Sequence, residues 1–206
     1  MAALGEYRYG AGRGAKNLIM LTLGTGVGGG IIIDGEVYHG GGYAGEVGHI
    51  TIDPDGPLCR CGNYGCLESY IGANRIMERA EEEVRTGVET TLKNYAGNIT
   101  PKIIEDEAYK GDRVAMDIVR EMARFLGIAI SNYCAILDPE RVILGGGLSK
   151  MGDILLSGVE SEVKKRLYSR KGISIVFGEL GDRAAILGCY EMVILRHPVR
   201  RIRWKG

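Results

Sequence analysis

The sequence has 206 residues, no formal net charge at pH 7 and 45% hydrophobic residues, which is enough for one substantial core. The zero net charge argues against the basic field that attracts nucleic acid. The first residues show no basic patch followed by an apolar run, and no apolar stretch is long enough to cross a bilayer. We therefore expect a cytoplasmic protein that binds neither nucleic acid nor membranes.

The front of the chain is predicted to be rich in strands. Residues 18–23 are apolar and predict a buried strand, and a glycine turn over residues 24–29 leads into a second apolar run over 30–33. Asp34-Gly35 predicts a tight turn into a third short strand. Loops follow as far as Gly65, with one short strand near residues 49–52.

Helices dominate the rest. Helical spacing of apolar residues predicts a long helix over 112–137, which Asp138-Pro139 ends. Two strands, at 141–144 and 173–177, alternate with the later helices. The pattern indicates an α/β class. The other predicted helices cover residues 67–85, a segment starting at Thr100-Pro101, 153–167 and 183–196.

Five cysteines are present, and three of them lie close together in the sequence. An odd number with such a cluster favours a metal site over a disulfide framework. Three thiolates and one imidazole make a complete tetrahedral set for zinc, and a closed four-ligand site is structural. The alternative is three reduced thiols beside an unrelated histidine. The candidate zinc ligands are His49, Cys59, Cys61 and Cys66.

Two glycine-rich loops are candidate ligand sites. Gly24-Thr25-Gly26 lacks the Gly-Lys-Ser/Thr of a P-loop and precedes a strand, so it is not a dinucleotide-binding fingerprint either. Such a turn can still direct backbone N–H groups at phosphate oxygens, although a plain glycine hairpin is an alternative. Gly145-Gly146-Gly147 follows a buried strand and precedes a helix, which is where open α/β sheets bind ligands.

Together these segments resemble the ROK family of sugar kinases and repressors, which has the actin-like ATPase (ribonuclease H-like) fold. The resemblance covers nearly the whole chain, and the cysteine motif is its most specific part. It rests on residues 21–30, Gly45-Glu46-Val47-Gly48-His49, the cysteine segment 59–68, and Asp138-Pro139 followed by residues 140–147.

The resemblance implies a function and its residues. Gly24, Thr25 and Gly26 would bind phosphate, and Gly145, Gly146 and Gly147 would line the adenosine site of ATP, which acts with magnesium. Glu46, His49 and Glu68 would bind sugar hydroxyls, with His49 also a ligand of the structural zinc.

The implied substrate is a hexose. Glucose is preferred because residues 51–57 look glucokinase-like, while fructose, mannose and N-acetylated amino sugars stay open. The alternatives are a non-catalytic sugar sensor or repressor and a purely structural zinc module.

Two family motifs are not found in these 206 residues: an Asp-x-Gly-Gly-Thr phosphate loop, and the Asn-Asp pair whose Asp is the general base. We therefore expect residues 1–206 to be the C-terminal lobe of such a kinase, with an inserted zinc-binding segment at 46–68 and negligible activity alone. The last helix is apolar on more than one face, so we expect a homo-oligomer or a partner N-terminal lobe to cover it.

Overall fold

The computed structural model describes residues 1–167 and 172–194. Their centre is a five-stranded sheet in the order β3-β2-β1-β4-β5. The pairs β1–β4 and β4–β5 are parallel, whereas β1–β2 and β2–β3 are antiparallel. The strands are β1 (Leu18–Leu23), β2 (Val27–Ile33), β3 (Glu36–Val37), β4 (Arg141–Gly145) and β5 (Ser174–Phe177). The expected α/β class is confirmed.

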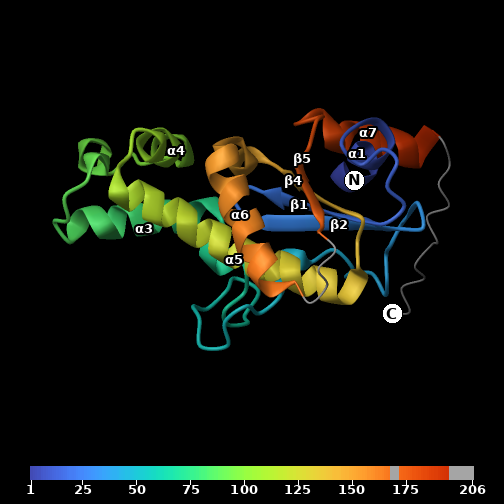
Figure 1. Cartoon of the computed structure of the whole chain (residues 1–206), viewed down its shortest axis with the longest axis horizontal. Helices are drawn as coiled ribbons and strands as arrows, with labels where there is room; N and C mark the ends of the chain where they lie inside the picture. The colour runs from blue at the N-terminus through green and yellow to red at the C-terminus, as the bar shows by residue number, and fades with distance from the viewer. Residues whose placement is uncertain (168–171, 195–206) are drawn as a thin grey trace.

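Helices cover both faces of the sheet (Figure 1). On one face lie α1 (Ala2–Tyr9) and α7 (Arg183–Ile194), and on the other lie α5 (Arg113–Leu137) and α6 (Asp153–Arg166). Alternate residues of β1 point to opposite faces, as the pleat of a strand requires. Ile19 and Leu21 join the large core beneath α5 and α6, while Leu18 and Met20 join a smaller core beneath α1.

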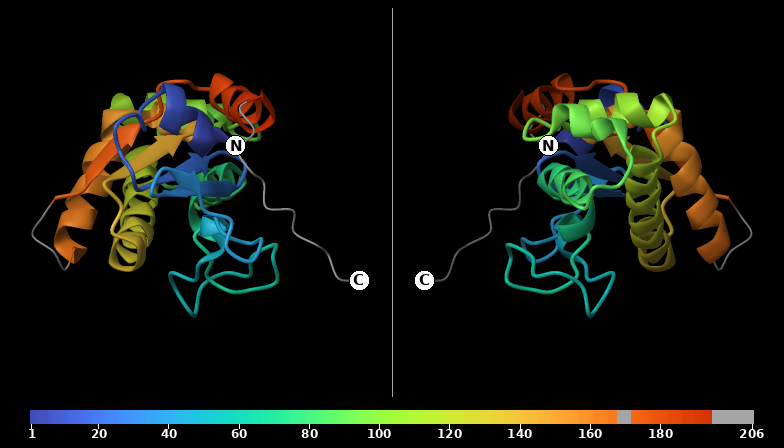
Figure 2. Two further views of the ribbon diagram at one scale, coloured as in Figure 1. Left: turned by 90° about the vertical axis from the view of Figure 1, so that its right-hand side faces the viewer. Right: turned by 90° about the vertical axis from the view of Figure 1, so that its left-hand side faces the viewer.

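The remaining helices form one end of the molecule. They are α2 (Glu68–Ile71), α3 (Ala73–Arg85) and α4 (Pro101–Tyr109). Thr100 caps α4 and Asp112 caps α5, each accepting a hydrogen bond from a backbone N–H in the first turn. A left-handed Asp138 ends α5. Residues between β3 and α2 form a loop that projects from the body (Figure 2).

Two sequence-based expectations were wrong in detail. The helix predicted over 67–85 is broken at Gly72, whose backbone is extended with φ −62° and ψ 146°. The strand predicted near 49–52 is instead a 3₁₀ turn, η1 (Val47–His49), followed by an isolated bridge between Thr51 and Cys66. At the break the N–H of Ala73 donates to the carbonyl of Gly24, in the turn that follows β1, and η1 lies against Val27 at the start of β2.

Helix α7 keeps apolar side chains in solvent. Ile186, Tyr190 and Val193 are 68%, 50% and 73% exposed, which confirms that one face of this helix is uncovered. Cys189 is also exposed on this helix. The end of the predicted helix and the basic residues from Arg196 onward lie outside the described residues. Among the helices described, none combines the length and apolar character needed to span a membrane.

Candidate functional site

The two glycine loops meet at one edge of the sheet. Strands β1 and β4 are parallel neighbours, so their carboxyl ends lie side by side. Gly146 has φ +85°, and a Cβ built there would lie 2.4 Å from the carbonyl oxygen of Leu23. Only glycine allows this approach, because the left-handed backbone and the contact both exclude a side chain.

A cavity of about 390 Å³ opens at this edge. It brings together the Gly24-Thr25-Gly26 turn (the phosphate-type turn), the second glycine loop at Gly146 and all three expected sugar ligands. Its lining includes Gly24, Gly26, Gly146, Glu46, His49 and Glu68. Thr25 lines a neighbouring cavity with Pro57 and Arg60, and this cavity shares Gly26 and Glu68 with the first. Gly145 is buried as the last residue of β4.

A third cavity of about 330 Å³ lies on the other side of the glycine loop. Gly147 and Leu148 form one wall, and the start of α4, with Pro101 and Lys102, forms another. The lining thus combines apolar residues with two lysines, Lys102 and Lys150, and one carboxylate, Glu105.

The turn after β1 is held by backbone and side-chain hydrogen bonds. The N–H of Gly24 donates to the carbonyl of Gly26 at 3.0 Å, and the N–H of Ala73 donates to the carbonyl of Gly24 at 2.9 Å. The N–H of Val27 donates to Oε2 of Glu68, also at 2.9 Å. The turn is thus fixed from the side of α2 and α3.

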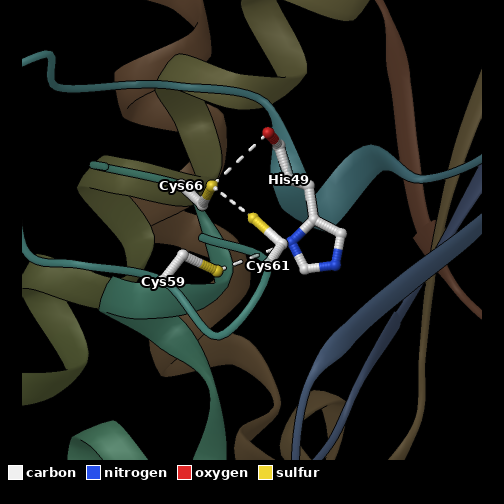
Figure 3. A group of neighbouring side chains, drawn as sticks. All are labelled: His49, Cys59, Cys61 and Cys66. Carbon is white, nitrogen blue, oxygen red and sulfur yellow. Dashed lines mark hydrogen bonds between the residues drawn. The ribbon is translucent and has the colours of Figure 1, made fainter. Parts of the chain in front are cut away.

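The four predicted metal ligands converge (Figure 3). The ligand atoms of His49, Cys59, Cys61 and Cys66 all lie within 4.8 Å of one another. Nδ1 of His49 is 3.6 Å from Sγ of Cys59, and the sulfurs of Cys61 and Cys66 are also 3.6 Å apart.

These spacings fit a tetrahedral ion. Zinc bonds of ~2.3 Å to sulfur and ~2.05 Å to nitrogen place two sulfurs about 3.8 Å apart and a sulfur and a nitrogen about 3.6 Å apart. For these two pairs of ligand atoms, the separations of 3.6 Å agree with the expected values to about 0.2 Å. No cysteine forms a disulfide among the described residues, so the thiols are available as ligands.

The thiols differ in their tendency to ionise. Burial opposes ionisation of Cys59, but hydrogen bonds, beginning with the backbone of Cys61, lower its pKa to about 6. Burial, together with the neighbouring thiols of Cys61 and Cys59, raises the pKa of Cys66 to about 12. One thiolate therefore forms readily while its crowded neighbour keeps its proton, and a bound cation is the element that would hold all three as thiolates.

His49 connects the cluster with the cavity. Its Nδ1 faces Cys59, whereas Nε2 lies 4.0 Å from Oε2 of Glu46 in the cavity. An imidazole held at one nitrogen presents the other in a fixed direction, which suits a directional hydrogen bond to a ligand.

Comparison with known proteins places this site in a family. Residues 1–195 match the ROK family. The chain belongs to the ROK family. It is 41% identical over 195 residues to a glucokinase of Halalkalibacterium halodurans, which covers 91% of this chain and 59% of that relative. It is also 37% identical over 197 residues to a putative xylose repressor of a Caldicellulosiruptor species, covering 93% of this chain and 49% of the relative.

A solved structure gives the same assignment. The ROK family glucokinase from Streptomyces griseus, in complex with glucose and AMPPNP, matches with a TM-score of 0.84 and 36% identity. The match covers 93% of this chain and 64% of that chain. The chain thus spans about half to two thirds of the length of these relatives. The expected ROK fold is confirmed, and both kinases and repressors of the family are similar to this chain.

Two tyrosines not identified from the sequence form hydrogen bonds that hold the loop that carries the site residues. Tyr133 of α5 is buried, and its hydroxyl donates to the carbonyl of Val47 at 2.6 Å, which anchors the η1 turn. Tyr70 donates to Asp53 at 2.7 Å and anchors the loop before the cysteines. Both tyrosines lie far in sequence from their partners, so no local pattern reveals these bonds.

Proposed function

We propose that this ROK protein binds a hexose, with glucose preferred, and ATP with magnesium, as part of an ATP-dependent hexose kinase. The observation that supports this most is the single cavity lined by the phosphate-type turn together with Glu46, His49 and Glu68. Carboxylates and imidazole supply the directional acceptors and donors that sugar hydroxyls need.

We propose a role for each of these residues from the cavity that it lines. Glu46, His49 and Glu68 hold the sugar hydroxyls, and the turn Gly24-Thr25-Gly26 faces the phosphates. The backbone N–H of Gly26 is the proposed donor, because the N–H of Gly24 is bonded to the carbonyl of Gly26. Gly145, Gly146 and Gly147 shape the nucleotide side, with the cavity at Gly147 and Lys102 taking the adenosine part. Thr25 stays a proposed phosphate-binding residue between Gly24 and Gly26, although it lines the neighbouring cavity.

We propose a structural zinc ion held by His49, Cys59, Cys61 and Cys66. With four protein ligands it has no open position, so it supplies rigidity and no reactive water. It fixes the ring of His49, and through that ring it orders the sugar side of the cavity. Free thiols of this kind persist in a reducing compartment, which supports a cytoplasmic location.

Phosphoryl transfer also needs a proton acceptor beside the sugar hydroxyl. Among the described residues that line the cavity, the carboxylates are Glu46 and Glu68. Both are proposed to hold sugar hydroxyls, and neither is proposed as the proton acceptor. We therefore propose that residues 1–206 act as one lobe with a zinc segment at 46–68, and that this lobe alone turns over ATP negligibly.

The exposed face of α7 bears on assembly. Ile186, Tyr190 and Val193 leave apolar area in solvent, and such area favours association. We propose that a second copy or an N-terminal lobe covers it. Sedimentation across a wide concentration range tests this, and a strictly monomeric species throughout would contradict it.

A sugar-sensing or repressor role is the second candidate. Similarity to the putative xylose repressor favours it, because the matched region is the same part of this chain. In this case the cavity would bind a sugar without phosphorylating it. Binding of xylose in preference to glucose would support this candidate.

A two-part experiment separates these functions. Protein supplied with zinc and magnesium is tested for ATP-to-ADP conversion with glucose, and its melting temperature is measured with glucose, mannose, fructose, N-acetylglucosamine and xylose. We expect glucose to raise the melting temperature without appreciable turnover. Turnover at enzyme-like rates would refute the proposed inactivity of the lobe, and no stabilisation by any hexose would refute the hexose site.

A further inference from the structure

Glu68 also contacts the backbone at the turn that follows β1. Its Oε2 accepts the backbone N–H of Val27 at 2.9 Å, across 41 residues of sequence. A Cβ built on Gly26 would lie only 2.4 Å from the same oxygen. The carboxylate therefore rests directly on the turn that follows β1, and a side chain at residue 26 would displace it.

The residue next to His49 contacts Val27, the first residue after this turn. A Cβ built on Gly48 would lie 2.0 Å from the carbonyl oxygen of Val27, so the backbone of η1 lies against that carbonyl. Gly48 directly precedes His49, and Glu68 follows Cys66 by two residues. The peptide groups of Val27 are thus contacted on both sides by residues adjacent to predicted metal ligands.

Short connections join these residues to the cluster. The N–H of Leu67, between Cys66 and Glu68, donates to the carbonyl of Ile50 at 3.0 Å. The Leu67 side chain is fully buried. Sγ of Cys66 lies 3.5 Å from the carbonyl oxygen of His49. These contacts restrict how far Glu68 can move relative to the predicted metal ligands.

We propose that Glu68 is a positioning residue for the phosphate-binding turn, through which the order of the Cys₃His cluster sets nucleotide affinity. The inference rests on the proposed function and extends it, since it assigns Glu68 a second role besides sugar binding. A carboxylate has several acceptor positions, so the bond to Val27 leaves others for a sugar hydroxyl. Packed elements transmit such restraint because they do not deform continuously.

ADP binding by calorimetry, on protein supplied with zinc, measures the proposed coupling. Glu68→Ala should weaken ADP binding roughly tenfold, because a charge-assisted hydrogen bond to the turn is lost. Glu68→Gln keeps a carbonyl acceptor and should restore most of the affinity. Glu46→Ala is the matched control: it lines the same cavity and should weaken glucose binding, yet leave ADP affinity within about twofold of the unaltered protein.

A second pair of variants moves Glu68 without removing it. Gly26→Ala places a methyl group against Oε2, whereas Gly24→Ala meets no atom within 4 Å. Amide hydrogen exchange at Val27 should accelerate in Gly26→Ala and in Glu68→Ala, and it should stay protected in Gly24→Ala. This readout does not depend on catalysis.

Metal removal completes the test. Chelation should weaken ADP binding and expose the Val27 amide in the unaltered protein, but add little in Glu68→Ala, because both changes act through one contact. Equal ADP affinity in Glu68→Ala and the unaltered protein, or unchanged exchange at Val27, would overturn the inference while leaving the proposed function intact. Failure of the unaltered protein to bind ADP would overturn both.

Discussion

Removing the hydroxyl of Tyr133 is a sharp test of how α5 supports the site. Tyr133 is 4% exposed, and burial raises the pKa of its phenol, so it remains a neutral donor to Val47 at ordinary pH. In Tyr133→Phe the carbonyl of Val47 loses this partner. Leaving a buried acceptor unsatisfied costs about 1–3 kcal/mol. For a chain of this length, a loss of about 2 kcal/mol lowers the melting temperature by about 4–8 °C.

The assay is thermal unfolding, paired with glucose titration. Tyr109→Phe is the control, since Tyr109 donates a similar bond to Met151 at 2.9 Å from a side chain that is 57% exposed, where water can replace it. The buried variant should lose both stability and glucose affinity, because Val47 begins the turn that carries His49. Equal effects of the two variants, or unchanged glucose affinity in Tyr133→Phe, would refute this reasoning.

Three further predictions concern the metal, a buried carboxylate and acid stability. Chelation should lower the melting temperature of the unaltered protein but not of Cys66→Ser, and zinc analysis should find metal retained in a Cys189→Ser control. Glu6 accepts three backbone N–H groups, so Glu6→Gln should cost about 1.5–3 kcal/mol in urea unfolding. The pKa of Glu107 is lowered by Lys110, so its stabilisation exists above the unfolded pKa of about 4.3 and is lost as pH falls. Glu107→Gln should therefore flatten the fall in melting temperature below that pH.

The elements that local pattern determines were predicted well. Strand β1 and helix α5 follow directly from apolar periodicity and from caps at Asp112 and Asp138. The break at Gly72 could not be predicted, because helical spacing continues through it. At the break, the N–H of Ala73 donates to the distant Gly24, and a Cβ on Gly72 would lie 3.0 Å from the carbonyl oxygens of both Thr25 and Glu68.

The candidate site was predictable by residue type and less so by geometry. The cluster of three cysteines and His49 could be predicted because its chemistry is rare and its members are near in sequence. The hydrogen bonds from the Val27 N–H to Glu68 and from the Tyr133 hydroxyl to Val47 join residues 41 and 86 positions apart. The residues next to Glu68 and Tyr133 in the sequence do not indicate these partners, so only the fold reveals the contacts.

The most direct test of a metal-ordered hexose site is glucose titration by calorimetry, before and after chelation and again after zinc is restored. The account predicts saturable binding that chelation abolishes and zinc recovers, because Nδ1 of His49 faces the cluster while Nε2 faces the cavity. Glucose binding of equal strength without metal, or no glucose binding in any state, would contradict it.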